Sequence, residues 1–345
     1  MPDIFTDAEE RRLVVNQVAT NRGLAPWLIE KDLWVCWTLA RLQEIDGVPN
    51  LTFKGGTSLS KVHGLIHRFS EDIDLTFARD GWGFDGDRDP LRKGLSGKKR
   101  QKLIKEIATC AETTVREVVV PGFRAACRSR LPAGWAVDID DNDSQAIEFT
   151  FPTPAVTYGY CRPIVKVEFG ARGDPWPTSP NTIHPYIEED YAGMASSAIV
   201  KVATLNPERT FWEKVTLLHG LHHATLAKPD KNIARLSRHI YDVHCLWHTA
   251  TLREKIVDPS LLLAVVENKM VFFQDPKSRY ELVKEWKLTC EPHKALAETL
   301  RSDFRAMASM FFAKAQVPTF DEALGALGEV DTMVASWKGS ANGSA

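Results

Sequence analysis

The sequence predicts an α+β (α/β-like) protein with a mixed strand-and-helix part first and a helical part after it. Short segments of alternating apolar and polar residues recur between positions 51 and 169. The first of them runs into a glycine turn and a helical pattern, which is typical of a strand, turn, helix, strand unit. After Thr204, apolar residues recur at helical spacing almost throughout.

The elements of the first part follow from these patterns. Apolar positions between 7 and 43 fit two helices that break at 22–26, and Asp7 with Glu10 forms a capping-box pattern for the first helix. The segment 171–185 is rich in proline and is expected to be irregular. The further elements expected, in chain order, are a strand at 51–54, a short helix at 57–65, a strand at 73–77, a loop at 81–90, a helix at 98–118 and neighbouring antiparallel strands at 146–151 and 163–169.

The second part is predicted to be helical, with helices at 207–223, 235–249, 259–273, 279–285, 292–315 and 321–336. Aromatic residues on core positions of helices are expected to pack inside rather than to stack on bases: Trp34, Trp37, Phe211, Trp212 and Trp247. The domains expected are 1–200, 201–337 and a disordered Gly/Ser/Ala tail at 338–345.

Composition describes a globular protein that is 44% hydrophobic and 26% charged over 345 residues. The N-terminus is polar and no long uncharged apolar run occurs, so we expect a cytoplasmic protein without a membrane segment. The net charge of −2 gives no general attraction to nucleic acid. Basic residues do gather at 88–105, either as a patch for phosphates or as a solvated helix face.

Residues that suit a phosphate group lie in the turn Gly55, Gly56, Thr57 and Ser58. Such a turn at the start of a helix presents backbone N–H groups and a hydroxyl to an anion. At the start of the next expected strand, Asp72 and Asp74 flank Ile73. Strand alternation puts both carboxylates on one face. Paired carboxylates can hold Mg²⁺ (or Mn²⁺) together with phosphate oxygens. The alternative is a surface strand beside an ordinary helix cap.

Other charged residues near this stretch extend the candidate site. Lys61 and Arg68 follow the glycine turn and are candidates for contacts to the nucleotide. A third carboxylate is expected on a later strand, and in 164–169 Lys166 and Glu168 share one face while apolar residues share the other. Glu168 is therefore the candidate third metal ligand, with Glu148 as its competitor.

The stretch Leu51 to Phe77, which contains GGTSLSK and RFSEDIDL, resembles the AbiEii/AbiGii toxin family. That family has relatives among the MenT toxins and belongs to the DNA polymerase β-like nucleotidyltransferase superfamily. Further similarity lies in EKDLWV from Glu30, RTFWEKVTLLH from Arg209 and RHIYDVHCL from Arg238, so that the resemblance covers about residues 28–315. It implies a polymerase β-like nucleotidyltransferase domain with a mixed sheet, followed by a helical domain.

Carried onto this chain, the resemblance implies that Gly55 to Ser58 bind the phosphates of a nucleoside triphosphate and that Asp72 and Asp74 bind metal. It also implies catalytic roles for Lys214, which would contact the triphosphate, and Asp242, which would orient Lys214 or activate the acceptor. Without the resemblance, Lys214 would be interpreted as an exposed lysine on an amphipathic helix.

The function implied is that of a Mg²⁺-dependent nucleotidyltransferase toxin of a type IV-like toxin–antitoxin system, which inhibits growth by transferring a nucleotide to RNA, with the tRNA 3′ end as the expected acceptor. A cognate antitoxin is the implied protein partner. Two alternatives stay open at this point: nucleotidyl transfer to a protein or a small molecule, and a catalytically silent nucleotide-binding protein. His244 and His248, one helical turn apart, have a spacing that suits zinc, but without a third ligand at a telling interval we interpret them as packing residues.

Overall fold

The computed structural model describes residues 3–152, 154–157, 162–228, 235–312 and 315–341. The chain forms two compact units. The first, the sheet unit, comprises Met1–Val62, Phe69–Leu205 and Phe312–Lys314. The second, the helical unit, comprises His63–Arg68, Asn206–Phe311 and Ala315–Ala345. Both units therefore combine segments that are distant in the sequence.

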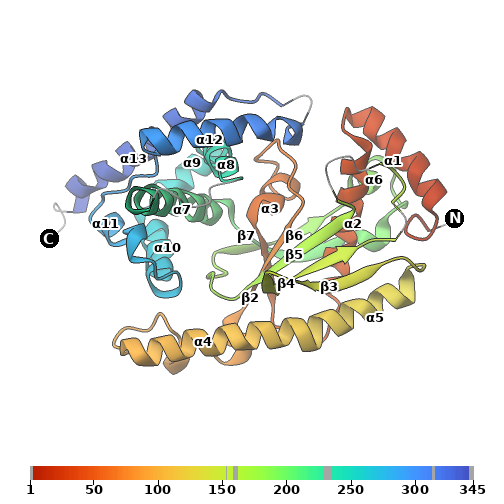
Figure 1. The fold of residues 1–345 in the computed structure, drawn as a ribbon, viewed down its shortest axis with the longest axis horizontal. Helices are drawn as coiled ribbons and strands as arrows, with labels where there is room; N and C mark the ends of the chain where they lie inside the picture. Colours follow the sequence, from red (N-terminus) through yellow and green to blue (C-terminus); the bar gives the residue numbers. More distant parts are fainter. Residues whose placement is uncertain (1–2, 153, 158–161, 229–234, 313–314, 342–345) are drawn as a thin grey trace. The chain divides into compact units, whose positions relative to one another are not determined.

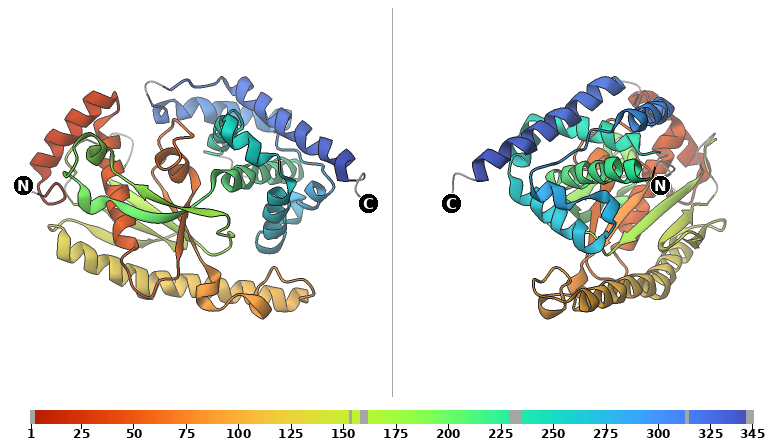
Figure 2. Two further views of the ribbon diagram at one scale, coloured as in Figure 1. Left: turned by 180° about the vertical axis from the view of Figure 1, so that it is seen from behind. Right: turned by 60° about the vertical axis from the view of Figure 1, so that its left-hand side comes forward.

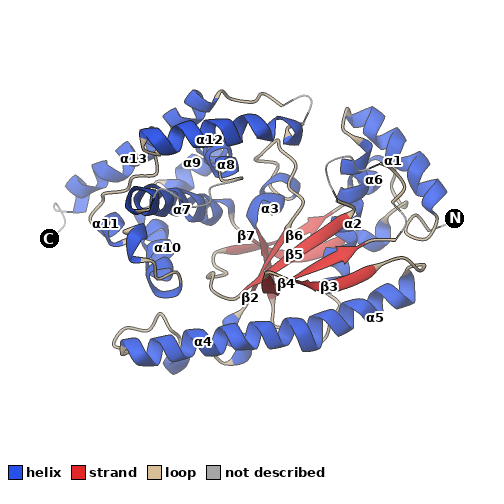
Figure 3. Ribbon diagram, viewed as in Figure 1, coloured by secondary structure: helices blue, strands red, loops and turns tan. Residues whose placement is uncertain are grey.

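The sheet unit contains a mixed sheet (Figure 3). It has seven strands in the order β3-β4-β5-β2-β1-β7-β6. Strand β2 runs parallel to β5 and β1 runs parallel to β7, whereas the other neighbours are antiparallel. The expected strands 51–54 and 73–77, and the antiparallel pair formed by β4 and β5, are confirmed. The strands are β1 (Leu51–Lys54), β2 (Ile73–Phe77), β3 (Ala136–Asp140), β4 (Asp143–Thr150), β5 (Ile164–Gly170), β6 (Thr178–Ile183) and β7 (Val200–Leu205).

The sheet has an apolar face and a polar face, as β5 shows most clearly. Its apolar residues Val165, Val167 and Phe169 are buried, whereas Lys166 and Glu168 between them are half-buried. This alternation follows from the two-residue repeat of a strand. The same repeat leaves charged side chains in the middle of the sheet on the polar face.

Helix α2 (Pro26–Leu42) packs on the apolar face. Its Trp34 stacks on Phe151 with ring centroids 5.1 Å apart, and Trp37 stacks on Phe149 at 5.6 Å. Phe123 of α5 (Val120–Arg130) meets Phe149 edge to face at 5.2 Å. Aromatic side chains bury about 150–250 Å² each, so this cluster is a main part of the hydrophobic core of the unit.

A long helix runs beside the sheet in both views (Figures 1 and 2). It joins α4 (Gly97–Thr114) to α5 (Val120–Arg130) through the π-helical turn Val115–Val119. The sequence predicts an end at 118, and the structure shows that the helix continues past Pro121. Proline lacks an N–H group and its ring collides with the carbonyl four residues earlier, so a widened turn before Pro121 lets the helix continue.

The helical unit contains a helix in each segment predicted beyond position 207 and one more, α9, but the helix expected at 292–315 ends at Ala306 and is followed by the 3-10 turn Met307–Met310. The expected internal packing of the aromatic residues is confirmed, since Phe211 stacks on Trp247 with centroids 6.3 Å apart and both are buried. The helices are α7 (Pro207–Ala227), α8 (Ser237–Trp247), α9 (Ala250–Ile256), α10 (Pro259–Phe272), α11 (Glu281–Lys284), α12 (Lys294–Ala306) and α13 (Phe320–Ala341); the sheet unit adds α1 (Ala8–Arg22), α3 (Gly55–Lys61) and α6 (Tyr186–Asp190).

Two expectations about irregular segments are wrong. The segment 171–185 contains β6, an edge strand in which Pro180 is tolerated because one side of an edge strand needs no ladder partner. Helix α13 continues to Ala341, past the start of the tail expected at 338, because buried positions such as Val330 and Val334 support the helix that extends into it. Residues 342–345 of that tail lie outside the described residues.

The described part of the chain includes no helix with the length and apolar character needed to cross a bilayer. Its cysteines, Cys36, Cys110, Cys127, Cys245 and Cys290, are all in the thiol form, and Cys161 lies outside the described residues.

Candidate active site

The sheet register lines up three charged residues on the polar face. Asp74 of β2 is the partner of Lys54 on β1 and of Glu168 on β5. Residues that pair across neighbouring strands point to the same face and lie about 5 Å apart. Asp74 therefore has a cation on one side and a second carboxylate on the other.

Asp72 directly precedes β2. Both Asp72 and Asp74 are half-buried, whereas Ile73 between them is fully buried, which is the alternation expected for two carboxylates on one face. The Thr57 hydroxyl donates a hydrogen bond of 2.5 Å to the carbonyl oxygen of Asp72. This bond ties the glycine turn to the chain that carries the acidic pair.

The glycine turn requires a residue without a side chain at Gly55. Its φ angle is +79°, and a Cβ there would collide with the carboxylate of Asp74. The Ser58 side chain is buried and its hydroxyl donates to the carbonyl of Gly55 at 3.0 Å. Because both hydroxyls of the turn bond to backbone oxygens, the backbone N–H groups of the turn are its remaining donors toward an anion.

The register distinguishes the two candidates for a third carboxylate. Glu168 pairs with Asp74, whereas Glu148 pairs with Lys166 on the far side of β5. The Glu148 carboxylate also accepts a hydrogen bond of 2.6 Å from Arg162. The Glu168 side chain is 45% exposed, and one of its oxygens lies 3.3 Å from the Lys166 ammonium. The strand order thus favours Glu168 as the neighbour of the acidic pair.

The donors of this site are carboxylate oxygens, which Mg²⁺ and Mn²⁺ prefer. Among the described residues, no three His, Cys, Asp or Glu side chains converge as a ready-made metal cluster. Magnesium commonly binds through one or two carboxylates and the phosphates of its substrate, without a complete protein cage. Asp72 and Asp74 fit that pattern.

The helical unit holds a second group of charges, buried around one carboxylate. Arg68 donates to Asp242 in a bidentate pair, Nε to Oδ1 at 2.7 Å and Nη2 to Oδ2 at 2.8 Å. The Lys214 ammonium lies 2.8 Å from the same Oδ2. The three side chains are 2%, 0% and 8% exposed. Two cations thus surround one anion, and Lys214 is buried rather than exposed as its helix periodicity alone suggested.

Burial and the neighbouring charges shift the pKa values of the side chains in this group. Burial alone would raise the pKa of Asp242, but the Arg68 and Lys214 charges hold that pKa far below its usual range. Burial lowers the pKa of Lys214, and the repulsion from Arg68 adds to this while Asp242 opposes it. His239 Nδ1 lies 3.4 Å from Lys214 Nζ, and burial holds the pKa of His239 well below its usual range. The neutral imidazole can therefore accept a hydrogen bond from the lysine.

Lys61 and Arg68, which were predicted with Lys214 to contact the nucleotide, both have acidic partners inside their own units. Lys61 lies in the sheet unit with its ammonium 2.8 Å from Asp32 and 3.6 Å from the centre of the Tyr186 ring. Arg68 is the bidentate partner of Asp242 described above. Each of them therefore already has a carboxylate partner, as Lys214 does in Asp242, and their contacts to the nucleotide stay predictions.

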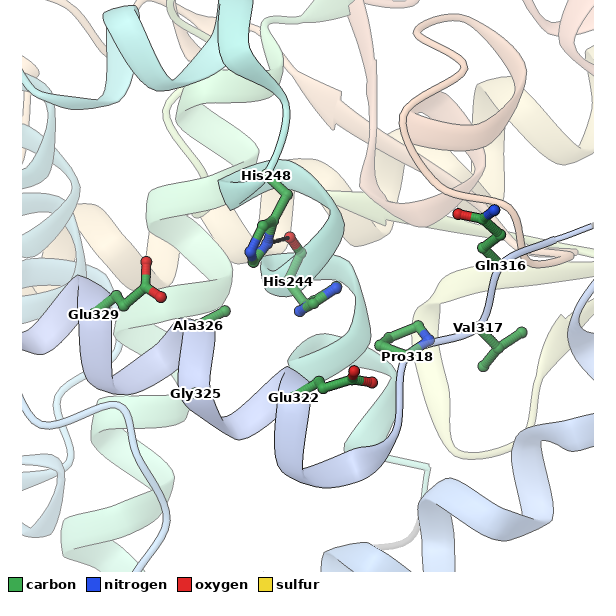
Figure 4. Close-up of a pocket in the computed structure, with 9 residues that line it drawn as sticks. All are labelled: His244, His248, Gln316, Val317, Pro318, Glu322, Gly325, Ala326 and Glu329. Carbon is green, nitrogen blue, oxygen red and sulfur yellow. Dashed lines mark hydrogen bonds between the residues drawn. The ribbon is translucent and has the colours of Figure 1, made fainter.

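A pocket of about 470 Å³ lies elsewhere in the helical unit, between the end of α8 and the start of α13 (Figure 4). His244 and His248 line it with ring centroids 4.4 Å apart, and the Glu322 carboxylate is engaged by Thr319. Within the described ranges these residues form no cluster of three metal ligands.

Sequence reasoning left Lys31, Asp32 and Glu71 without a role. Lys31 pairs with Glu71, directly before Asp72, and Asp32 pairs with Lys61. The signal was present in the sequence as Glu30-Lys31-Asp32, three consecutive charges inside an otherwise apolar helix. Their partners, however, come from other parts of the chain.

Residues 37–326 match the family model described as nucleotidyl transferase AbiEii toxin, type IV TA system. No curated relative matches the chain. Among solved structures, the chain is similar to MenT4, a nucleotidyltransferase toxin from Mycobacterium tuberculosis H37Rv, with 18% identity, 94% of this chain and 98% of that chain covered, and a TM-score of 0.44. Because the family model spans most of the sequence, the chain belongs to the AbiEii family of nucleotidyltransferase toxins of type IV toxin–antitoxin systems.

Proposed function

We propose that this nucleotidyltransferase moves a nucleoside monophosphate from a nucleoside triphosphate to RNA, with the tRNA 3′ end as the expected acceptor. In this reaction an acceptor hydroxyl oxygen bonds to the α-phosphorus and the bond to the β-phosphate oxygen breaks, which releases pyrophosphate. The observation that carries the proposal is the placement of Asp72 and Asp74 on the polar face, beside the turn at Gly55.

Mg²⁺ or Mn²⁺ would be held by Asp72 and Asp74, with Glu168 as the neighbouring carboxylate in the sheet register. When bound, the ion supplies positive charge to the triphosphate and to the leaving pyrophosphate. The carboxylates are the right donors for a hard cation, and soft thiolate ligands are absent from this part of the described sheet.

The phosphates have two proposed sets of contacts in the protein. The backbone N–H groups from Gly55 to Ser58 form the first, because the hydroxyls of this turn bond to the backbone. Lys214 forms the second. It belongs to a buried group in which two cations, Arg68 and Lys214, lie against the Asp242 carboxylate. Asp242 then acts by orienting Lys214. In this proposal the sheet unit is the nucleotidyltransferase domain and the helical unit contributes Lys214 and Asp242.

An RNA acceptor is supported by the start of α4. Lys98, Lys99, Lys102 and Lys105 are all exposed there, and the Glu106 carboxylate lies 3.8 Å from the Lys102 ammonium. Exposed lysines bind phosphates without reading sequence and make affinity depend on salt. A polymer can contact this helix and still reach a separate reacting centre with its end, whereas a small acceptor cannot.

The test is incubation of the purified protein with total tRNA, soluble protein, Mg²⁺ and each α-³²P-labelled nucleoside triphosphate in turn, followed by a denaturing gel. We expect label on an RNA band, which identifies the base as well as the acceptor. The matched variants are Asp72→Asn with Asp74→Asn, which should abolish labelling, and Asp46→Asn, an exposed loop aspartate that should leave it unchanged.

The other possible results of the labelling experiment would each support a different function. Label on a protein band would replace RNA by a protein acceptor, and label on a small product would indicate a small-molecule acceptor. Equal growth inhibition by the wild type and the doubly substituted chain, without label on any band, would favour a silent nucleotide-binding protein. A lysine-to-glutamine variant at Lys98, Lys99 and Lys102 should weaken RNA binding and flatten its salt dependence.

A further inference from the structure

Helix α2 carries three consecutive charged residues that are almost completely buried. Glu30, Lys31 and Asp32 are 0%, 2% and 6% exposed, in a helix whose remaining buried residues are mostly apolar. An isolated buried charge is strongly unfavourable, so each of these side chains requires a partner. Consecutive helix residues point about 100° apart, so the three partners must come from three directions.

The first partner lies at the N-terminus of the chain. Glu30 pairs with Arg11 of α1 at 2.9 Å and also accepts from the backbone N–H of Ala155 at 2.9 Å. These contacts involve neither β1, α3 nor β2. Glu30 therefore links α2 to α1 and to the chain after β4, away from the residues of the candidate active site.

The second and third partners lie in the sequence between the two parts of the candidate active site, after the glycine turn and before the acidic pair. Asp32 pairs with Lys61, the last residue of α3, at 2.8 Å and accepts from the backbone N–H of Tyr186 at 2.7 Å. Lys31 pairs with Glu71, which directly precedes Asp72. One carboxylate of α2 thus holds the end of the glycine-turn helix, and the neighbouring ammonium holds the start of the acidic strand.

Buried ion pairs contribute little net stability compared with apolar side chains of the same shape, but they fix the position of the groups they join. In the sheet unit, the hydrogen bond from the Thr57 hydroxyl to the Asp72 carbonyl also joins the glycine turn directly to the acidic pair. The glycine turn and the acidic pair are therefore connected to each other directly, and α2 holds the last residue of the turn's helix and the residue before the acidic pair.

We propose that Lys31 and Asp32 are positioning residues for nucleotidyl transfer, which act through Glu71 and Lys61 to set the spacing between the glycine turn and the acidic pair. The proposal rests on the function proposed above. It gives Lys61 a role as the anchor of α3 rather than as a contact to phosphate. A misplacement of about 1 Å in an active site can lower the rate about 100-fold, so the loss of one anchor has a measurable effect.

The test is a double-mutant cycle on one anchor, with Asp32→Asn, Lys61→Met and the double variant, measured by kcat and by KM for the nucleoside triphosphate. Each single variant is expected to lower kcat by about 10- to 100-fold with KM changed less than about threefold. The double variant should be no worse than either single one, because both remove the same contact. Lys31→Met should show the same loss through the other anchor.

Glu30→Gln is the matched control, since it breaks an equally buried pair on the same helix without touching the site segments. It should lower the melting temperature as the anchor variants do but leave kcat within about twofold. A loss of kcat by Glu30→Gln as large as that by Asp32→Asn would overturn the proposal. Multiplicative losses in the cycle, or a rise in KM with Lys61→Met alone, would make Lys61 a phosphate ligand instead and also overturn it.

Hydrogen exchange of the peptides that cover 55–61 and 71–77 supplies a readout that needs no activity. Asp32→Asn and Lys31→Met should speed exchange in both peptides, whereas Glu30→Gln should not. If the wild type transfers no nucleotide to any acceptor, the proposed function fails while this measurement still decides whether α2 holds the two segments. If Asp32→Asn does not fold, Lys61→Arg, which keeps the charge, should retain both kcat and slow exchange.

Discussion

Acidification is expected to destabilise the helical unit through His219 of α7, a residue on the same helix as Lys214. The His219 side chain is completely buried. Its Nε2 lies 3.1 Å from the carbonyl oxygen of Arg279, and its Nδ1 lies 3.1 Å from the backbone N–H of Thr289. These partners assign a proton to Nε2 and a lone pair to Nδ1. A second proton on Nδ1 would face the N–H donor of Thr289.

The size of the effect follows from the pKa of this ring. Burial lowers the pKa of His219 from 6.5 to about 4, so the folded state binds its proton more weakly than the unfolded state does. The stability that the neutral ring contributes is therefore fully present above pH 6.5 and is lost as the pH falls toward 4. From pH 8 to pH 5 the loss from this one group is about 2 kcal/mol, at 1.36 kcal/mol per pKa unit.

Urea unfolding at pH 8 and pH 5, followed by tryptophan fluorescence, measures this loss. His219→Gln removes the titration while its amide can still donate to Arg279, so its free energy of unfolding should fall about 2 kcal/mol less than that of the wild type over this range. His67→Gln, at an exposed side chain, is the control and should follow the wild type. Equal pH dependence in His219→Gln and the wild type would refute the reasoning.

Three further changes test the site. Gly55→Ala should lower transferase activity at least about 10-fold because its Cβ collides with Asp74. Gly23→Ala, at a similar φ of +66° with open space around it, should only lower stability, by about 1 kcal/mol. Equal transferase activities of the two variants would contradict this. Asp242→Asn leaves two buried cations without their anion and should lower the free energy of unfolding by about 3–5 kcal/mol, and a urea midpoint close to that of the wild type would argue against a buried pair. Thr57→Val removes one hydrogen bond and should lower stability by about 1 kcal/mol, measured in the same way; a gain in stability would show that the bond to the Asp72 carbonyl is not needed.

The local parts of the site are predictable from the sequence. A glycine turn and two aspartates on either side of an isoleucine are patterns of a few neighbouring residues, and strand alternation is sufficient to place both carboxylates on one face. The structure agrees with that alternation at Ile73. The choice between Glu168 and Glu148 was different, because both alternate correctly in their own strands. Only the order of strands shows which of them lies beside Asp74, and strand order depends on contacts between distant segments.

Non-local pairing also explains why the partners of Lys61 and Arg68 in the structure were not predicted from the sequence. A lysine and an arginine close to a phosphate-binding pattern are natural candidates for phosphate contacts when only the sequence is known. Arg68 instead pairs with Asp242, a residue 174 positions later, and Lys61 pairs with Asp32 from the preceding helix. Local sequence patterns carry no information about such partners.

Burial does nevertheless restrict what these charges can do. A charge inside an apolar helix, such as Lys31 in α2, must have a partner of opposite sign, so the sequence already indicates that a pairing exists even though it does not identify the residue. Such partners are drawn from segments that the fold must hold in one place, because a mobile segment would leave the charge unpaired for part of the time. The Lys31 and Asp32 partners lie directly before Asp72 and at the end of α3. Unexplained charges on a buried helix are therefore a reason to examine the segments that pair with them for function.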